Sequence, residues 1–462
     1  MRGWNTTSIL ESLSTPITLL IASGALLLLN NMSRIFGLAR MSFYHGKDSI
    51  YLKTIDGKDT TLASLCKQVL PRCRLNPFLF NGDLQTVWTV LKSQAVPIYY
   101  KRRLFEQQDP CYPGTFAVDF VVKPYEGEDE IGLPRTTLFS EQEFEALPSN
   151  DSRPMLVALH GLSGGSYELY LRHVLAPLVA EKGGWEACVV NARGCANSKI
   201  TTPVLFNARA TWDVRQTVKW LRKTFPNRPL YGVGFSLGAN ILTNYLGEEG
   251  DKCELKAAVA LSCPWSLDVS NLALQRTWLG RNVYSRAMGT NLKRLYNIHK
   301  ELILQNPAID AEEVEKVRFL HEFDRAIQTH TWGYPTEQAY YRDASSADSV
   351  LAIRIPFLAI SAEDDPIVAD EAIPRLEFQQ TPYGVLCTTS LGGHLSWFEL
   401  GGSRWMARAT EAFFQKIARE VDFDHYSRNH PLPEGQIRRE KREPLRPWFD
   451  PMRRRMHVDS ET

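Results

Sequence analysis

Two serines in this chain lie inside a Gly-x-Ser-x-Gly pentapeptide, a pattern that can hold a nucleophilic hydroxyl at the tip of a sharp strand-to-helix turn. They are Ser163 in Gly161-Leu-Ser-Gly-Gly165 and Ser236 in Gly234-Phe-Ser-Leu-Gly238. Small residues two positions before and after the serine let the backbone close that tightly. Ser236 follows a short apolar run and leads directly into a helical pattern, whereas Ser163 comes just after His160. We therefore predict that Ser236 is the nucleophile, with Ser163 as the alternative.

A serine hydroxyl becomes nucleophilic only when a base removes its proton, and an acid must hold that base in the right tautomer. His394 follows an apolar run and two glycines, so its loop can bring the imidazole back over the serine. The acidic loop Glu363-Asp364-Asp365 follows another apolar run. We predict His394 as the base and Asp365, the residue before a proline, as the acid; Asp364 stays open as the alternative. The chain order Ser, Asp, His is that of the α/β-hydrolase fold.

Two backbone N–H groups could bind the negative charge that develops on the carbonyl oxygen in a tetrahedral intermediate. One belongs to Leu237, directly after the predicted nucleophile, where the helix that follows also points its amide-rich end. The other belongs to Leu162, in the loop from His160 to Gly165 that follows an apolar run. We predict that these two groups form an oxyanion hole and that His160 shapes the loop.

From residue 155 onward, short apolar runs alternate with longer helical patterns, which is typical of a parallel sheet covered by helices on both faces. The runs expected as strands are 155–159, 186–191, 230–233, 256–262, 355–361 and 385–389, and the expected helices include 208–225 and 405–421. From about 264 to 352 a helical, polar and aromatic stretch interrupts this alternation. The sequence predicts an α/β protein with the α/β-hydrolase fold: a mostly parallel central sheet, helices on both faces and a helical cap insertion over the sheet's carboxyl edge.

The predicted hydrolase domain covers residues 41–425. Within it, the stretch 41–105 is predicted to be irregular, 114–122 alternates as a strand does, and 124–154 is predicted to be an acidic surface loop. After it, residues 426–462 alternate basic and acidic side chains among prolines and lack apolar periodicity. We expect this last segment to be a charged, disordered tail.

Residues 1–40 contain an apolar, uncharged run, Ile17 to Leu29, which could extend to Met32 between basic flanks. Because a helix needs about 20 residues to cross a bilayer, three interpretations are open: a membrane anchor, a cleaved signal peptide, or an amphipathic helix docked on a soluble domain. No small-x-small cleavage site follows Leu29, which disfavours the signal peptide. Membrane association through residues 17–32 is therefore one prediction, placing the protein at an endomembrane or lipid surface; an intracellular location is the other.

The overall composition excludes several classes of function. A net charge of +1 gives no electrostatic reason to expect nucleic acid or an acidic substrate as partner. The eight cysteines form no CxxC pair and no metal-ligand spacing, so they are expected to be reduced core thiols, with Cys66 and Cys73 as one pair that could form a disulfide. No phosphate-binding loop is visible, and we predict neither a metal nor a cofactor.

Several motifs together resemble the type-4 AB-hydrolase family, which includes fungal medium-chain fatty acid ethyl ester synthase/esterases and animal membrane-bound abhydrolase lipases. Besides the Ser236 pentapeptide they are Asn81-Gly-Asp-Leu-Gln-Thr86, Gly114-Thr-Phe-Ala-Val-Asp119, His160-Gly-Leu-Ser-Gly-Gly-Ser-Tyr-Glu168, Asn191-Ala-Arg-Gly-Cys195, Asp364-Asp365-Pro366 and Gly392-Gly-His394. The resemblance implies acyl-ester chemistry on lipid-like substrates, a catalytic triad of Ser236, Asp365 and His394, and an N-terminal membrane anchor.

These observations predict a serine hydrolase or acyltransferase that acts through an acyl-enzyme. Its expected substrates are an acyl ester, with a medium-length chain, or acyl-CoA, together with water or an alcohol. Two other hypotheses are a dedicated alcohol O-acyltransferase of a biosynthetic pathway and a non-catalytic, membrane-tethered scaffold.

Overall fold

A ten-stranded sheet runs through the protein, and its central strands are parallel. The computed structural model describes residues 37–91, 96–126, 131–423 and 449–452. In spatial order the parallel strands are β8 (Glu186–Asn191), β7 (Met155–Leu159), β9 (Leu230–Phe235), β10 (Leu255–Leu261), β11 (Phe357–Ala362) and β12 (Gly384–Thr389). Antiparallel strands extend both edges: β1 (Met41–His45) beside β12, and β5 (Thr115–Val122) and β4 (Tyr99–Glu106) beyond β8, followed by the short β6 (Thr136–Leu138). The predicted fold class is confirmed.

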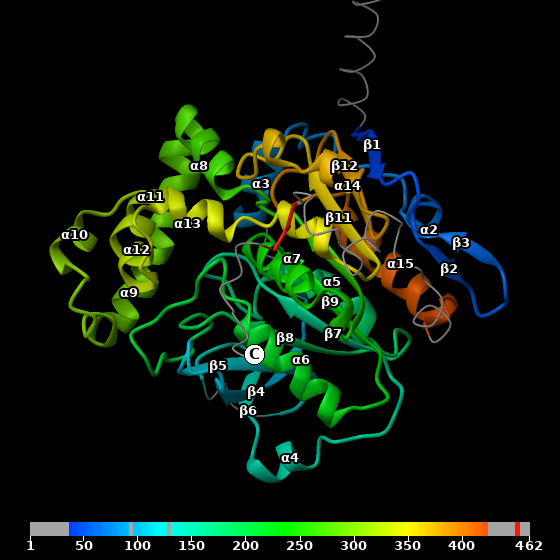
Figure 1. The fold of residues 1–462 in the computed structure, drawn as a ribbon, viewed down its shortest axis with the longest axis horizontal. Coiled ribbons are helices and arrows are strands. Elements are labelled where there is room, and N and C mark those ends of the chain that lie inside the picture. The colour runs from blue at the N-terminus through cyan, green and yellow to red at the C-terminus, as the bar shows by residue number, and fades with distance from the viewer. Residues whose placement is uncertain (1–36, 92–95, 127–130, 424–448, 453–462) are drawn as a thin grey trace, which may run out of the picture.

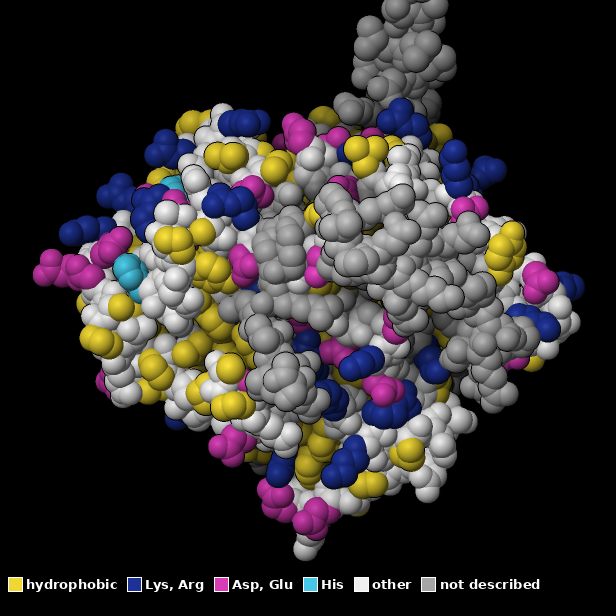
Figure 2. Space-filling view, in the orientation of Figure 1, with side chains coloured by type: hydrophobic (Ala, Val, Ile, Leu, Met, Phe, Trp, Pro, Cys, Tyr) yellow, Lys and Arg dark blue, Asp and Glu magenta, His cyan; other side chains and the backbone are white. Residues whose placement is uncertain are grey.

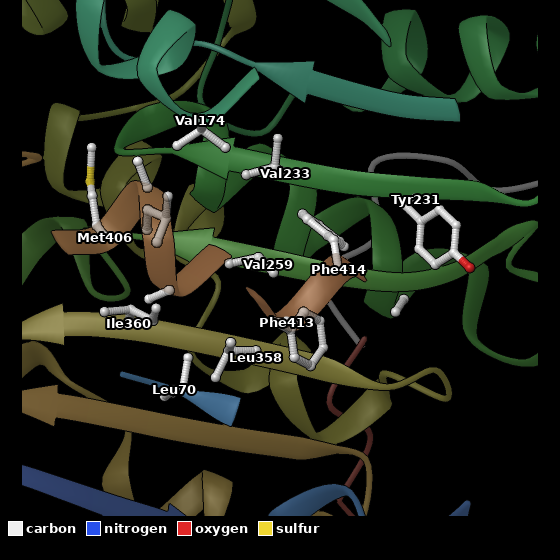
Figure 3. Close-up of a cluster of buried hydrophobic side chains, with 14 of the residues drawn as sticks. Leu70, Val174, Tyr231, Val233, Val259, Leu358, Ile360, Met406, Phe413 and Phe414 are labelled. Carbon is white, nitrogen blue, oxygen red and sulfur yellow. The ribbon is translucent and has the colours of Figure 1, made fainter. Parts of the chain in front are cut away.

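Helices cover both faces of the sheet, as the apolar runs predict for strands buried on two sides. Successive side chains of a strand point to opposite faces: in β11, Leu358 and Ile360 belong to one core cluster, whereas Phe357 and Ala359 belong to the other. The first cluster also includes residues of α2 (Leu62–Val69), α5 (Leu169–Val179) and α15 (Trp405–Glu420), and the second includes residues of α6 (Trp212–Thr224) and α7 (Leu237–Glu249). Figure 3 shows Phe413 and Phe414 of α15 against strand residues such as Val259 and Leu358.

The interruption predicted from about 264 to 352 corresponds to a helical insertion between β10 and β11. It contains α8 (Leu267–Arg276), α9 (Arg286–Ile303), α10 (Ala311–Lys316), α11 (Leu320–Phe323), α12 (Thr329–Trp332) and α13 (Glu337–Ala344), with two π-helical turns, η2 (Gly280–Ser285) and η3 (Asp324–Gln328). Figure 1 shows this insertion, called the cap below, beside the edge of the sheet at which α7 begins.

The prediction that residues 41–105 are irregular is wrong. This stretch forms β1, the hairpin of β2 (Tyr51–Lys53) and β3 (Asp59–Thr61), helices α2 and α3 (Gly82–Leu91), and β4. The strand β1 is stabilised by pairing with β12, more than 300 residues away. The local sequence pattern therefore gives little indication that a strand forms here. The predicted loop 124–154 also contains two elements, the strand β6 and the helix α4 (Glu141–Glu145). The helix begins with a capping box formed by Ser140 and Glu143.

The chain ends lie mostly outside the described residues. This holds for the apolar run 17–32 and for most of the predicted tail 426–462. Within the tail, residues 449–452 are placed beside α7 (Figure 1), where Met452 is buried near Gly247, so this short segment departs from the expected disorder. Among the described residues, no helix combines the length and the apolar character needed to cross a membrane. All eight cysteines are free thiols, so Cys66 and Cys73 form no disulfide.

A buried polar network joins the antiparallel edge of the sheet to the loop that follows β7. Asp119 on β5 accepts two hydrogen bonds from Arg102 on β4, at 2.6 and 2.8 Å, and both side chains are almost fully buried at 0% and 3% exposure. The same carboxylate accepts from the Ser166 hydroxyl at 2.6 Å and from the Asn191 amide at 2.8 Å. The charges are therefore paired and hydrogen-bonded, which is the condition under which buried ions are tolerated.

We predict that Asp119→Ala lowers the free energy of unfolding by about 3–5 kcal/mol, because it leaves the Arg102 guanidinium buried without its counter-ion. Glu141→Ala is a matched control, since it removes an ion pair with Arg103 in which the carboxylate is 72% exposed. That exposed pair contributes about 0–1 kcal/mol. Urea unfolding followed by circular dichroism measures both variants, and equal effects would contradict the role given to the buried network.

Candidate active site

Ser236 lies at a sharp turn between β9 and α7. Its backbone has φ 52° and ψ −120°, a conformation that non-glycine residues rarely adopt. The two flanking glycines are required by close approach: a Cβ at Gly234 would lie 2.5 Å from the Ala239 Cα, and one at Gly238 would lie 2.3 Å from the Leu159 carbonyl oxygen. The Ser236 N–H donates to Leu261 at the end of β10. The turn therefore holds the hydroxyl beyond the carboxyl ends of the parallel strands.

A continuous chain of hydrogen bonds links the three side chains predicted as a triad. His394 Nε2 lies 2.9 Å from Ser236 Oγ, and His394 Nδ1 lies 2.8 Å from Asp365 Oδ2. A carboxylate can only accept, so Nδ1 carries the proton and Nε2 is left to accept from the serine hydroxyl. The Asp365 side chain is 1% exposed and that of His394 is 11% exposed. This is the tautomer that a general base needs.

The structure separates the three adjacent acids of the loop after β11 by their partners. Asp365 faces His394, and its second oxygen accepts from the N–H groups of Ile367 and Val368. Asp364 Oδ1 instead accepts from the Gly393 N–H at 3.0 Å. Glu363 accepts from Thr388 and from Arg40. The geometry thus pairs His394 with Asp365, while Asp364 holds the backbone next to the histidine.

Helix α3 holds the histidine loop from the other side, a contact that the sequence patterns did not indicate. Thr86 Oγ1 accepts from the His394 N–H at 2.9 Å. Its neighbour Gln85 accepts from the Phe398 N–H at 2.7 Å. Both residues belong to the motif 81–86, which is visible in the sequence. The sequence does not show that this motif contacts residues more than 300 positions further along the chain.

The loop after β7, which carries Ser163 and Leu162, lies beside Ser236. A Cβ on Gly161 would lie 3.4 Å from the Ser236 Cβ. His160 fixes this loop: Nδ1 donates to the Gly161 carbonyl at 2.7 Å and Nε2 accepts from the Ala192 N–H at 2.9 Å. Burial lowers the pKa of His160 to about 4, so the ring is neutral near pH 7 and both contacts are kept. The hydroxyl of Tyr170 accepts from the Gly161 N–H at 2.8 Å.

The two predicted oxyanion donors, the N–H groups of Leu162 and Leu237, have no backbone hydrogen-bond partner among the described residues. Leu237 is the first residue of α7, where N–H groups lack an intrahelical acceptor. By contrast, Ser163 makes no hydrogen bond to a histidine within the described part of the chain. The arrangement around Ser236 can therefore support nucleophilic attack on a carbonyl carbon, and that around Ser163 cannot.

A cavity of about 80 Å³ opens beside Ser236 and is enclosed largely by the cap. Leu162 and Leu237 line it at the sheet edge, and the cap contributes apolar side chains including Leu274, Met288 and Leu292. Residues of α8, α9 and α13 thus lie over the carboxyl ends of the strands, as expected for the insertion. Such a concave, mainly apolar site next to a nucleophile suits an acyl group or another lipid-like part of a substrate.

The family described as alpha/beta hydrolase fold matches residues 154–399. The chain is 36% identical to a monoacylglycerol lipase of Saccharomyces cerevisiae, over 81% of this chain and 90% of that protein. It is 32% identical to medium-chain fatty acid ethyl ester synthase/esterase 2 of the same yeast, over 74% and 85%. Phospholipase ABHD3 of Homo sapiens is 30% identical, over 75% and 78%.

We predict that Asp365→Asn lowers kcat for hydrolysis of an activated ester by about 10⁴-fold, because an amide cannot hold His394 in the required tautomer. Asp364→Asn is the matched control: it changes the neighbouring side chain in the same way, and we expect less than about a 10-fold loss, equivalent to one hydrogen bond. Steady-state kinetics with circular dichroism as a check on folding measures both. A larger loss for Asp364→Asn would mean that the acid is misassigned.

Proposed function

The chain belongs to the alpha/beta hydrolase fold family, and within it we propose a serine esterase that works through Ser236, His394 and Asp365. The observation that carries the proposal is the hydrogen-bonded chain from Asp365 through His394 to the Ser236 hydroxyl, next to an apolar cavity. The family and its lipase and esterase relatives support the general assignment, a hydrolase of acyl esters.

The proposed reaction begins when Ser236 Oγ attacks the ester carbonyl carbon and its proton passes to His394 Nε2. The carbonyl oxygen becomes negatively charged and accepts hydrogen bonds from the Leu162 N–H in the loop after β7 and from the Leu237 N–H at the start of α7. Asp365 stabilises the imidazolium that forms. The C–O bond to the alcohol then breaks, the alcohol leaves with the proton from His394, and the acyl group remains on Ser236.

The acyl group leaves the enzyme when a second molecule gives a proton to His394 and attacks the carbonyl carbon. The ester bond to Ser236 Oγ then breaks, and His394 returns the proton to that oxygen. Water at this step yields a fatty acid, and an alcohol yields a new ester. We propose that both outcomes occur at the one site, because the same base serves either acceptor. The yeast ethyl ester synthase/esterase is named for both directions. Acyl-CoA as donor, and with it a dedicated alcohol O-acyltransferase, is the second candidate.

The proposed substrates are esters of medium-chain fatty acids. The cavity beside Ser236 has a mainly apolar lining, from which Lys, Arg and His are absent. Burial of a methylene group contributes about 0.8 kcal/mol, so a hydrocarbon chain gains affinity there. The names of the yeast relatives point to monoacylglycerols and to medium-chain ethyl esters as candidates.

We also propose that the protein works at a lipid surface, supported by an exposed apolar face beside the site. The face comprises Leu38, Phe78, Phe80, Leu84, Val87, Val90 and Leu91 from the N-terminal region, and Leu272, Trp278, Leu279 and Val283 from the cap. The two parts adjoin, because the Tyr284 hydroxyl of the cap donates to Asp83 on α3 at 2.6 Å. The elements β1, α3 and α8 lie along one edge of the molecule in Figure 1. Exposed patches of this kind mark interaction surfaces.

The charges around this face, and the apolar run that precedes it in the sequence, favour a membrane as the partner that binds it. Exposed arginines border it, at positions 72, 74, 276, 281 and 286, and Figure 2 shows Lys and Arg side chains among hydrophobic ones along the same edge. Basic groups beside apolar side chains favour an anionic lipid surface. The described chain also begins here: Gly37 accepts a hydrogen bond from the Leu75 N–H, and the apolar run 17–29 precedes it in the sequence.

We predict that Ser236→Ala abolishes hydrolysis of p-nitrophenyl decanoate, with kcat lowered by about 10⁶-fold as for other triad serines, and abolishes labelling by a fluorophosphonate probe. Formation of ethyl decanoate from decanoyl-CoA and ethanol should disappear with it. Ser163→Ala is the control, because that serine lies in the adjacent loop in the same pentapeptide pattern; it should keep labelling and turnover. If Ser163→Ala loses labelling and Ser236→Ala retains it, the nucleophile is wrong.

For the lipid surface, we predict that the double variant Val90→Asp/Trp278→Asp lowers turnover of an ester embedded in anionic vesicles by about 10-fold, because it removes two apolar contacts with the bilayer. Turnover of a short, water-soluble ester should not change. Ile298→Asp replaces an exposed apolar residue on α9 that does not belong to this face, and should affect neither assay. Equal losses on both substrates would contradict the docking role.

A further inference from the structure

Two polar side chains of α8 line the mainly apolar cavity beside Ser236 and carry buried oxygen atoms without hydrogen-bond partners. Ser270 and Asn271 are 5% and 7% exposed. The Ser270 hydroxyl and the Asn271 Oδ1 are buried and have no partner. A buried polar atom left unpaired is destabilising, so such atoms are uncommon in folded proteins. Both residues border the space in which a substrate would lie.

A buried carboxyl group, Asp324, lines the same cavity from the turn η3. It is 6% exposed, and its Oδ2 accepts from the Tyr341 hydroxyl at 2.6 Å. The hydrogen bonds of the described residues give Oδ1 no partner. Burial raises the pKa of Asp324 to about 7, so a large share of the molecules carry a neutral carboxyl near pH 7 that can donate as well as accept. The residue begins a π-helical turn, an arrangement found frequently at functional sites.

The chemistry of these groups indicates what they would bind. Ser270 can donate or accept, Asn271 Oδ1 accepts, and a neutral Asp324 can do both. The cavity lining contains no Lys, Arg or His, so nothing in it would neutralise a phosphate or a carboxylate. An uncharged group with one or more hydroxyls satisfies all three residues without a counter-ion.

We propose that Ser270, Asn271 and Asp324 form a hydrogen-bonding subsite for an uncharged, hydroxyl-bearing part of the ester substrate. The inference rests on the proposed esterase function and goes beyond it by assigning a specificity site to the cap. The hydroxyls have two chemical sources: the alcohol portion, as in a glyceryl ester, or a hydroxyl on the acyl chain. The shared requirement is a neutral hydroxyl next to an apolar chain.

The test uses the full-length protein and three esters with acyl chains of equal length: ethyl decanoate, 1-decanoylglycerol and ethyl ω-hydroxydecanoate. We expect at least one hydroxyl-bearing ester to exceed ethyl decanoate in kcat/KM by about 10-fold, the effect of satisfying buried groups that are otherwise unpaired. Preference for the glyceryl ester assigns the subsite to the alcohol portion, and preference for the hydroxydecanoate assigns it to the acyl chain.

The variants Asp324→Leu and Asn271→Leu should remove this preference by lowering kcat/KM for the hydroxyl-bearing ester about 10-fold while that for ethyl decanoate is kept or raised. Asp324→Asn, which keeps a neutral hydrogen-bonding group of the same shape, should retain the preference. So should Met288→Leu, a change of apolar packing in the same cavity, which is expected to affect all three esters alike. Ser270→Ala is the mildest change and should give a smaller loss in the same direction.

A binding measurement separates this proposal from the proposed function. In the Ser236→Ala background, calorimetry should show that Asp324→Leu weakens binding of the preferred hydroxyl-bearing ester relative to ethyl decanoate, whether or not the wild type turns either over. Equal kcat/KM or equal affinity for all three esters in the wild type would overturn the subsite. Equal losses on all three esters in the leucine variants would overturn it too, because that is the effect of a purely structural role.

Discussion

The strained turn at Ser236 is the constraint on which the surrounding structure depends. A serine at positive φ between a buried strand and a helix is costly unless the neighbours hold it, and such strain concentrates at functional sites. Two glycines permit the close approach of Ala239 and Leu159 to this turn. Once the turn is fixed, the position of the hydroxyl and the direction of the first α7 amides are fixed together. The side chains of His394 and Asp365 then reach toward this hydroxyl from the loops after β12 and β11, at hydrogen-bond distances.

The residues that position the loops around Ser236 come from regions far apart in the chain. Thr86 on α3 holds the His394 backbone, and Asp119 on β5 holds the loop after β7 through Ser166 and Asn191. Neither contact involves the atoms that would react: the first binds the backbone N–H of His394, and the second binds the side chains of Ser166 and Asn191. Preorganisation of this kind lets donors and base face the reacting atoms without rearrangement. The antiparallel strands and α3 therefore contribute to the site as well as to the core.

The sequence predicted the parallel strands, and it predicted the serine and the histidine that the structure brings within hydrogen-bond distance, because apolar runs, glycine spacing and chain order are local signals. It failed for β1 and α3, whose stability comes from contacts more than 300 residues away. The sequence favoured Asp365 as the acid but left Asp364 open, since adjacent side chains diverge according to the turn that carries them. Asp324 and Asn271 were also missed: in a cap helix, a polar residue that faces a cavity has the same local pattern as one that faces water.

The cap sets conflicting requirements on the cavity that it encloses. Its leucines and methionine exclude water, which strengthens every electrostatic interaction around Ser236, yet Ser270 and Asn271 leave polar atoms unpaired there. An apolar replacement of similar shape would remove that cost, as substitutions of buried polar groups often do. In the empty cavity these unpaired atoms raise the energy of the protein, and a bound hydroxyl lowers it by pairing with them. A substrate without the hydroxyl leaves the atoms unpaired, so the energetic penalty becomes selectivity for substrates that carry a hydroxyl. Selectivity in this enzyme would then come from the cap, and reactivity from the sheet edge beneath it.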